Sequence, residues 1–289
     1  MSAKPIPVSP IDDAQARKPG MSRTQKLLFF VTAWLICLMP FLFWWNTWFG
    51  RKLSDRQVTE YLHDTKKPRH IQQALVQVGE RITRQDATAK NWYPDLVRLA
   101  ADPVEEVRNT DAWVMGQDTA GVGFHEALLK LLSDSSPMVR GNAALSLVRF
   151  GDASGRLQIL ALLQPAPITS PESGRIIDAD RAGTPIHQGG LIAKLEYGQK
   201  QIAEIRSPIP GRIRSVAGTG ANVSSGTEVA VVDPANEQVW EALRALYLIG
   251  QIDDLPAIRP YERDLPDVSN DVRQQATETE QAIRKRSGS

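Results

Sequence analysis

The spacing of apolar residues predicts two helical regions separated by a segment of strands. From about residue 55, apolar residues such as Val139, Ala143 and Leu147 recur every three or four positions, which places them on one face of a helix. Between 166 and 232, short β-branched runs alternate with glycine-rich turns, as in small strands. Helical spacing returns from residue 233. We therefore expect a mainly α fold with one inserted all-β unit.

The helical regions contain a repeated unit. Copies begin at Asp102, Asp134 and Asp233, reach a valine five or six positions later, and close near a glycine. The valines are Val107, Val139 and Val239, the glycines are Gly116, Gly151 and Gly250, and a weaker copy places Val272 after Asp267. An amphipathic helix precedes each copy, and Asp, Ser and Pro favour the start of the next helix. The pattern predicts stacked antiparallel helix pairs.

This unit resembles the HEAT-repeat family. The resemblance rests on the Asp-x(4–5)-Val-Arg turn, the small residues of the second helix and the closing Gly, and it covers about 55–165 and 233–286. Trp240 replaces the arginine in the third copy. The resemblance implies an α-solenoid of HEAT-like pairs at 51–165 and 233–289, used as a binding scaffold and without catalysis.

The segment between the helical regions carries one pattern twice. Residues 170–196 and 207–233 align at a constant offset of 37. The identical pairs are Ser170/Ser207, Pro171/Pro208, Gly174/Gly211, Arg175/Arg212, Ile176/Ile213, Gly183/Gly220, Gly189/Gly226 and Ala193/Ala230. The duplication predicts two pseudo-symmetric hairpin layers. We expect them to form a unit at 166–232 that is inserted into the turn of one helix pair, a kind of site that tolerates insertions.

The two copies resemble the halves of the biotinyl/lipoyl-carrier fold, a flattened barrel, over about 168–233. In carrier domains the modified lysine lies at the tip of the hairpin between the halves. Lys200, eight residues before Pro208, has that place, so the resemblance implies covalent biotin or lipoate on Lys200. Gln199 and Gln201 depart from the family's flanking residues. We therefore expect an ordinary exposed lysine and no cofactor, as in the related modules of bacterial secretion and efflux adaptors that lack a carrier lysine, and modification of Lys200 is the alternative.

An uncharged run of 23 residues, Leu27–Phe49, precedes the repeats. About 20 apolar residues span the hydrocarbon core of a bilayer, and three tryptophans near the end of the run would suit the membrane interface. We expect a transmembrane helix within 23–50, bilayer contact through 27–49, and a disordered tail at 1–22. A cleaved signal peptide and a buried core helix are the alternatives.

Basic residues flank this run on both sides. Four precede it, and three follow closely. They are Arg17, Lys18, Arg23 and Lys26 before the run and Arg51, Lys52 and Arg56 after it. The small excess of basic residues before the run favours a cytoplasmic N-terminus and a periplasmic body at a bacterial inner membrane. A difference of one residue does not decide on which side of the membrane the body lies.

The composition offers few candidate catalytic or metal-binding residues. A formal net charge of +1 gives no field for binding nucleic acid. The one cysteine, Cys37, excludes an intrachain disulfide and a cysteine-based zinc site. The histidines are His63, His70, His125 and His187, and their spacing predicts no metal site. The sequence contains no GxSxG, HExxH, P-loop or dinucleotide motif, so we expect no catalytic residue.

Some charged and aromatic residues are assigned to structural roles. We interpret two acidic pairs as solvated helix caps and three tryptophans as packing between repeats. These residues are Glu105, Glu106, Asp253 and Asp254, and Trp92, Trp113 and Trp240.

These patterns together predict a non-enzymatic, membrane-tethered scaffold. It would bind partner proteins through its helical surface and its β module, within an envelope transport or secretion assembly. The alternative is a biotinyl or lipoyl carrier subunit, modified at Lys200, that serves a membrane-bound enzyme. A third hypothesis keeps the helical array as the docking surface and gives the β module a structural role only. The sequence names no partner and no oligomeric state.

Overall fold

The computed structural model describes residues 23–46, 52–264 and 267–288. The chain divides into two compact units, Met1–Lys52 and Leu53–Ser289. The second unit contains the helical repeats and all the strands that the structure describes.

Helix α1 (Arg23–Asn46) is the described helix of the first unit. Among the described residues, no helix has both the length and the apolar character needed to cross a membrane. The prediction of a single-pass membrane protein is therefore wrong. That prediction placed a transmembrane helix in 23–50, bilayer contact through 27–49 and the body in the periplasm. Residues 47–49 of the expected run lie outside the described part. The tail expected at 1–22 also lies outside it.

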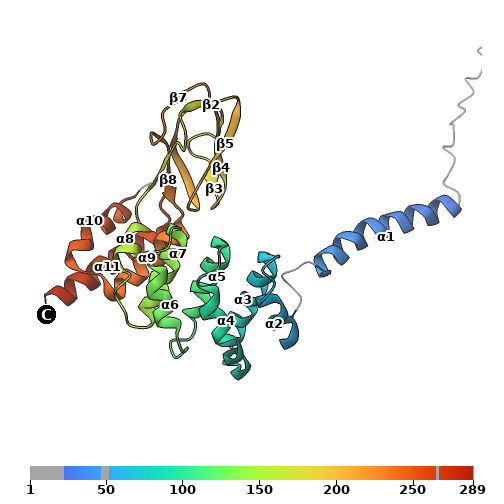
Figure 1. The fold of residues 1–289 in the computed structure, drawn as a ribbon, viewed down its shortest axis with the longest axis horizontal. Helices are drawn as coiled ribbons and strands as arrows, with labels where there is room; N and C mark the ends of the chain where they lie inside the picture. The colour runs from blue at the N-terminus through green and yellow to red at the C-terminus, as the bar shows by residue number, and fades with distance from the viewer. Residues whose placement is uncertain (1–22, 47–51, 265–266, 289) are drawn as a thin grey trace, which may run out of the picture. The chain divides into compact units, whose positions relative to one another are not determined.

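The second unit is mainly an array of helix pairs (Figure 1). The first members are α2 (Asp55–Leu62), η1 (Ala87–Trp92) with α4 (Tyr93–Leu99), α6 (Phe124–Leu131), α8 (Arg156–Ala161), and η2 (Ile252–Asp254) with α10 (Leu255–Ile258) and η3 (Arg259–Glu262). The second members are α3 (Pro68–Thr83), α5 (Glu105–Met115), α7 (Pro137–Arg149), α9 (Asn236–Ile249) and α11 (Asn270–Ser287). Each second member packs on the next one along the chain. The predicted helical-repeat fold is confirmed.

The residues that mark the repeats also hold the array together. The four repeat valines are 0–1% exposed. They are Val107, Val139, Val239 and Val272. The Ser136 hydroxyl accepts hydrogen bonds from the first backbone N–H groups of α7, which fixes where that helix begins. The Arg108 guanidinium pairs with Asp134 of the next repeat at 2.6 Å. The repeated turn therefore caps one helix and joins it to its neighbour.

The core of the array lies in two clusters that meet at α7. One cluster extends from Leu53 to Leu147, and the other extends from Ala144 to Ile283. Helix α7 contributes Val139 and Leu147 to the first cluster, and it contributes Ala144 and Val148 to the second. Its two faces therefore join the N-terminal and C-terminal repeats into one array.

Eight strands form two four-stranded antiparallel sheets between α8 and α9. The strands are β1 (Ala166–Thr169), β2 (Gly174–Ala179), β3 (Pro185–Ile186), β4 (Leu191–Tyr197), β5 (Gln201–Arg206), β6 (Gly211–Val216), β7 (Asn222–Val223) and β8 (Glu228–Pro234). The strand orders are β1-β8-β6-β3 and β5-β4-β2-β7. Strands β2, β3 and β4 recur as β6, β7 and β8 at the sequence offset of 37. The structure therefore has the pseudo-symmetry that the sequence duplication predicts.

The repeated glycine at the start of β2 and β6 is required by close strand contact. A Cβ atom on Gly174 would lie 2.2 Å from the carbonyl oxygen of Glu196, and one on Gly211 would lie 1.8 Å from that of Asp233. Either distance is a steric overlap, so glycine is required where these strands pair.

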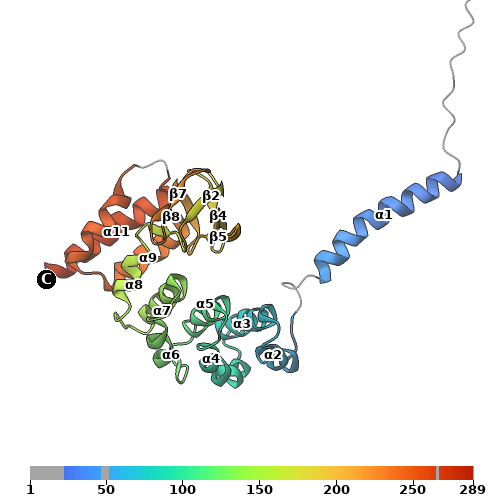
Figure 2. The ribbon, with the colours of Figure 1, turned by 45° about the horizontal axis from the view of Figure 1, so that its top comes forward.

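The β unit stands on the array beside α7, α8 and α9 (Figures 1 and 2). The Gln188 amide donates to the Glu105 carboxylate of α5 at 2.5 Å. Met138 of α7 packs against the core of the β unit. These contacts and the two chain connections position the base of the β unit on the repeats.

Candidate functional site

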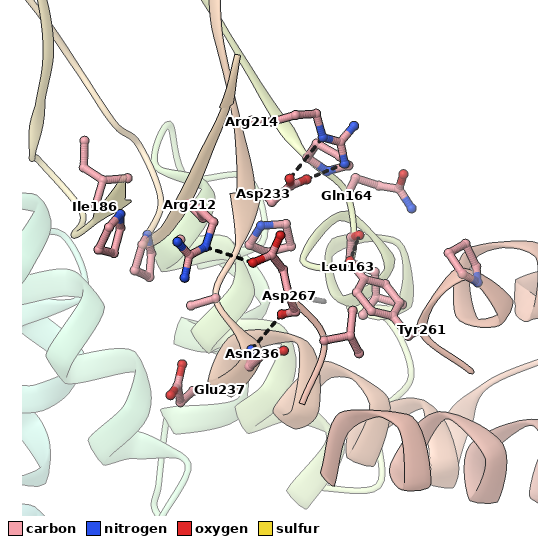
Figure 3. A pocket seen from close by; sticks show the side chains of 18 of the residues that line it. Leu163, Gln164, Ile186, Arg212, Arg214, Asp233, Asn236, Glu237, Tyr261 and Asp267 are labelled. Carbon is pink, nitrogen blue, oxygen red and sulfur yellow. Dashed lines mark hydrogen bonds and ion pairs between the residues drawn. The ribbon is translucent and has the colours of Figure 1, made fainter. Parts of the chain in front are cut away.

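A groove of about 920 Å³ lies where the base of the β unit meets the C-terminal repeats (Figure 3). One side comes from β3, β6 and the end of β8. The other side comes from residues 163–165 after α8, the start of α9, α10, η3 and residues 267–268. Segments far apart in the sequence thus form one concave surface.

The groove is lined mainly by apolar residues, and prolines are unusually frequent among them. Its prolines are Pro165, Pro185, Pro210, Pro234, Pro256 and Pro260. Leu163, Ile186, Tyr261 and Val268 add larger side chains. Proline has a fixed φ angle and lacks a backbone N–H, so these positions give the walls a constrained shape with few exposed donors.

Two ion pairs lie beside this apolar surface: the first joins neighbouring strands of one wall, and the second crosses the groove. Arg214 of β6 pairs with Asp233 of β8, with Nε 3.0 Å from Oδ2. The Arg212 Nε lies 3.3 Å from the Asp267 carboxylate. The Asn236 side-chain amide donates to the Asp267 backbone carbonyl at 3.0 Å. These contacts tie the loop at 267–268 to β6 and to the start of α9.

Tyr261 connects the wall formed by η3 to the end of α8. Its hydroxyl donates to the backbone carbonyl of Leu163 at 2.6 Å. Burial, and then the charge of Asp233, raise the pKa of Tyr261 to about 12. The hydroxyl therefore stays protonated near neutral pH and keeps this hydrogen bond.

The arrangement suits binding better than catalysis. Both arginines of the lining are paired with carboxylates. The described lining contains no Ser, Thr or Cys beside a general base. The volume lies within the range of about 300–1,000 Å³ that is typical of ligand pockets. The groove can therefore hold an apolar segment or ligand without a chemical step.

Lys200 lies apart from this groove. It is exposed in the turn that joins β4 to β5 and has a backbone φ of 60°. Gly198 in the same turn has a φ of 53°. The turn therefore places Lys200 at a hairpin tip, and it is not among the residues that line the groove. Its modification remains a prediction.

The four histidines are in separate places. His63 lies 3.1 Å from Asp95, and His70 lies 2.7 Å from Asp64. His125 lies 2.7 Å from Asp152, and His187 is exposed at the groove. In the part of the chain that the structure describes, no three His, Cys, Asp or Glu side chains come together to hold a metal ion. Sequence reasoning missed the carboxylate partners because each comes from outside the local pattern.

One residue of each acidic pair and one tryptophan differ from expectation. Asp254 is 2% exposed and pairs with Arg156, so its interpretation as a solvated cap is wrong. Glu105 accepts hydrogen bonds from Ser136 and the β unit. Trp113 is 43% exposed instead of packing fully between repeats. The sequence shows acidic and aromatic residues here, but not the neighbours that decide their environment.

Asp111 in α5 is a buried acid that the sequence did not single out. It is 0% exposed, and neither carboxylate oxygen has a hydrogen-bond partner among the described residues. Burial raises its pKa well above the ordinary value. Counted from the repeat valine, the same position is Ala143 in α7 and Leu243 in α9. Alignment of the repeats could have found this exception.

A family model supports the helical-repeat part of the fold. The sequence model of the HEAT repeat family matches residues 126–154, which include most of α6 and all of α7. A designed armadillo repeat protein is 15% identical, with 78% of this chain and 80% of that chain covered and a TM-score of 0.40.

A single-chain, multi-domain long-chain acyl-CoA carboxylase is also similar over a small part. It is 14% identical, with 33% of this chain covered and a TM-score of 0.23, and the chain spans 10% of that protein's length. None of the curated proteins matches the chain. The HEAT-model match and the helix pairs together support a helical-repeat protein in which residues 126–154 are similar to a HEAT repeat.

Proposed function

We propose that this protein is a non-enzymatic scaffold, and that the groove between its β unit and its C-terminal repeats binds a partner protein. The observation that carries the proposal is the apolar groove of about 920 Å³ at the junction of the two parts. Helical arrays supply extended surfaces for binding. The groove adds to such a surface a concave site with constrained walls.

The charges of the lining narrow the chemistry of the partner segment. Asp233 and Asp267 are paired with Arg214 and Arg212. Glu237 is exposed and makes no ion pair of 4 Å or less with the described residues. A fitting partner would therefore be an extended segment with apolar side chains for the groove and a basic residue for Glu237.

Affinity purification from the native host, followed by mass spectrometry, tests the groove. Ala257→Trp fills the groove, and Ala120→Trp adds the same side chain at an exposed turn before α6. We expect Ala257→Trp to lose at least one partner that the wild type and Ala120→Trp retain. Circular dichroism checks that both variants fold. Identical partners for all three folded proteins would contradict the proposal.

The charge of Glu237 gives a second test with the partner recovered above. Glu237→Lys should weaken binding about tenfold, because it places a positive charge where a basic partner residue is expected. Glu241→Lys, one turn further along α9, is the matched control. Equal binding by the two variants would remove Glu237 from the site.

The β unit supports a second candidate function, that of a biotinyl or lipoyl carrier. Its two related sheets are compatible with a carrier-like barrel, and Lys200 lies exposed at the tip between the halves. Intact mass of protein purified from the native host tests this function. An added biotin or lipoyl mass that is lost in Lys200→Arg would favour the carrier, whereas an unmodified mass would favour the scaffold.

A further inference from the structure

Among the edge strands that the structure describes in the β unit, β5 is the longest. It stands at one end of the strand order β5-β4-β2-β7, and β4 is the described strand that pairs with it (Figure 1). β5 has six residues, whereas β1 has four and β3 and β7 have two each. An edge strand presents unpaired backbone N–H and C=O groups, and natural proteins blunt such edges with short strands, prolines or charges. Shortness therefore does not blunt the edge at β5.

The related edge in the other half of the β unit is blunted by proline. At the offset of 37, Pro167 of β1 corresponds to Glu204 of β5, and their paired positions on β8 and β4 correspond as well. Pro165, just before β1, corresponds to Ile202. Proline at a sheet edge occupies positions where its missing N–H would face away from the paired strand. By this equivalence, Ile202 and Glu204 direct N–H groups outward that the edge of β1 lacks.

The side chains along this edge are available for contact. Ile202 is 59% exposed, although isoleucine is among the residues most often buried. Glu204 accepts two hydrogen bonds from Arg206, both at Oε2, which leaves Oε1 without a donor among the described residues. Lys200 is exposed in the turn just before the strand. An exposed apolar residue thus lies two positions from a basic residue on one side and two positions from an acidic residue on the other.

The start of β5 lies at the end of the β unit that faces away from the repeats. Tyr197, just before the hairpin tip, pairs with Gly174 of β2, and Gly174 also pairs with β7. Figure 1 shows β2 and β7 at the end of the β unit that is away from the helical array. Lys200 and Ile202 are not among the residues that line the groove. Contact at this edge therefore leaves the groove free.

We propose that β5 is a dimerisation edge, which pairs antiparallel with β5 of a second copy of this chain about a two-fold axis at Ile202. In this register the two copies of Ile202 lie opposite each other, and each Lys200 lies opposite a Glu204. A register centred on Glu204 would oppose two carboxylates, and one centred on Ala203 would oppose Ile202 to Glu204. Opposite charges stabilise a cross-strand pair and like charges destabilise it, so the two charges favour the axis at Ile202.

Disulfide cross-linking of the full chain tests both the edge and its register. The one natural cysteine is first removed as Cys37→Ser. Residues that exchange hydrogen bonds across an antiparallel pair have Cα atoms about 5.5 Å apart, within the range of about 4.4–6.8 Å for a disulfide. Ile202→Cys should therefore form a covalent dimer on mild oxidation with copper phenanthroline. Glu204→Cys, exposed on the same strand, is the matched control and should stay monomeric.

A proline copied from the related edge tests the outward backbone groups. Glu204→Pro, made in the Ile202→Cys protein, should fold because β1 accommodates Pro167 at the equivalent position. Each dimer would lose two hydrogen bonds, so the cross-linked fraction should fall by about tenfold. Glu204→Gln keeps the N–H and a side-chain oxygen, and it should retain most of the covalent dimer. Circular dichroism checks that each variant folds.

Exchange of the two charges tests the second copy as the occupant. In the Ile202→Cys protein, Lys200→Glu or Glu204→Lys alone should lower the cross-linked fraction roughly tenfold, because each dimer contains two such pairs. The two changes together should restore the covalent dimer, since opposite charges then face each other again.

Three results would overturn the proposal. They are the absence of a covalent dimer from Ile202→Cys, an equal yield from Glu204→Cys, and a dimer that persists unchanged in the folded Glu204→Pro variant. A strand of a different protein on β5 would give the first of these results. Failure of the double charge exchange to restore the dimer would overturn the axis at Ile202. The groove is judged separately, because Ala257→Trp fills it without touching β5.

Discussion

The helical array and the β unit are both built from repeated sequence, but their copies differ from one another at different kinds of position. The two halves of the β unit keep apolar residues at equivalent core positions, such as Ile176 and Ile213 or Leu195 and Val232. The array instead places the buried acid Asp111 where the next repeat has Ala143. Stacked repeats contact only their neighbours, whereas the two halves of the β unit share one core. The shared core of the β unit therefore varies less in polarity than the core positions of the repeats.

The glycine at the start of β2 and β6 should show the largest effect. We expect Gly174→Ala and Gly211→Ala each to destabilise the protein by about 3 kcal/mol, because a methyl group would overlap the paired strand. Urea denaturation measures the free energy of unfolding. Gly218→Ala is the control, since a methyl group there would have no atom within 4 Å. Equal stability of all three variants would show that the strand pairing is misplaced.

The buried acid of the array should show an intermediate effect with the opposite sign. Asp111→Asn should stabilise the protein at pH 7 by an amount on the order of 1 kcal/mol. The pKa of Asp111 is raised by folding, so the wild type is most stable below the unfolded value and loses stability as the pH rises. The gain should therefore vanish near pH 3.

Urea denaturation between pH 3 and pH 8 checks this dependence. Asp271→Asn, at an exposed position of α11, is the matched control and should follow the wild type. A wild-type curve parallel to that of Asp111→Asn over the whole range would contradict a proton held at the buried site.

The equivalent arginines Arg175 and Arg212 should show the smallest effect on stability. Arg212 pairs with Asp267 at the groove, whereas Arg175 is exposed on the other half of the β unit. Each change to alanine should alter stability by less than about 1 kcal/mol, as for exposed ion pairs. Only Arg212→Ala should weaken binding of the groove partner. Equal binding by both variants would mean that the halves do not differ in function.

Much of the fold could be predicted because its pattern is local. The repeat valines and their caps mark the helix pairs, and the offset of 37 between Gly174 and Gly211 marks the two halves of the β unit. The prediction of a membrane helix was wrong, since no helix among the described residues is long and apolar enough to cross a membrane.

The candidate site could not be predicted in the same way. The prolines of the groove are visible in the sequence, but they come from β3, β8, α10, η3, the segment after α8 and the residue before β6, and their convergence is a tertiary property. The same holds for Arg212 and Asp267, which are 55 positions apart in the sequence. Pairs of this kind follow from the packing of one element on another.

Photo-cross-linking tests the central claim most directly, because it asks which half of the β unit contacts the partner. A benzophenone amino acid replaces His187 at the groove or, in the matched protein, Ser224, its equivalent at the offset of 37. Both positions are exposed. The account predicts a cross-link to the partner from position 187 and none from position 224. Cross-links from 224 alone, or equally from both positions, would contradict the groove as the docking site.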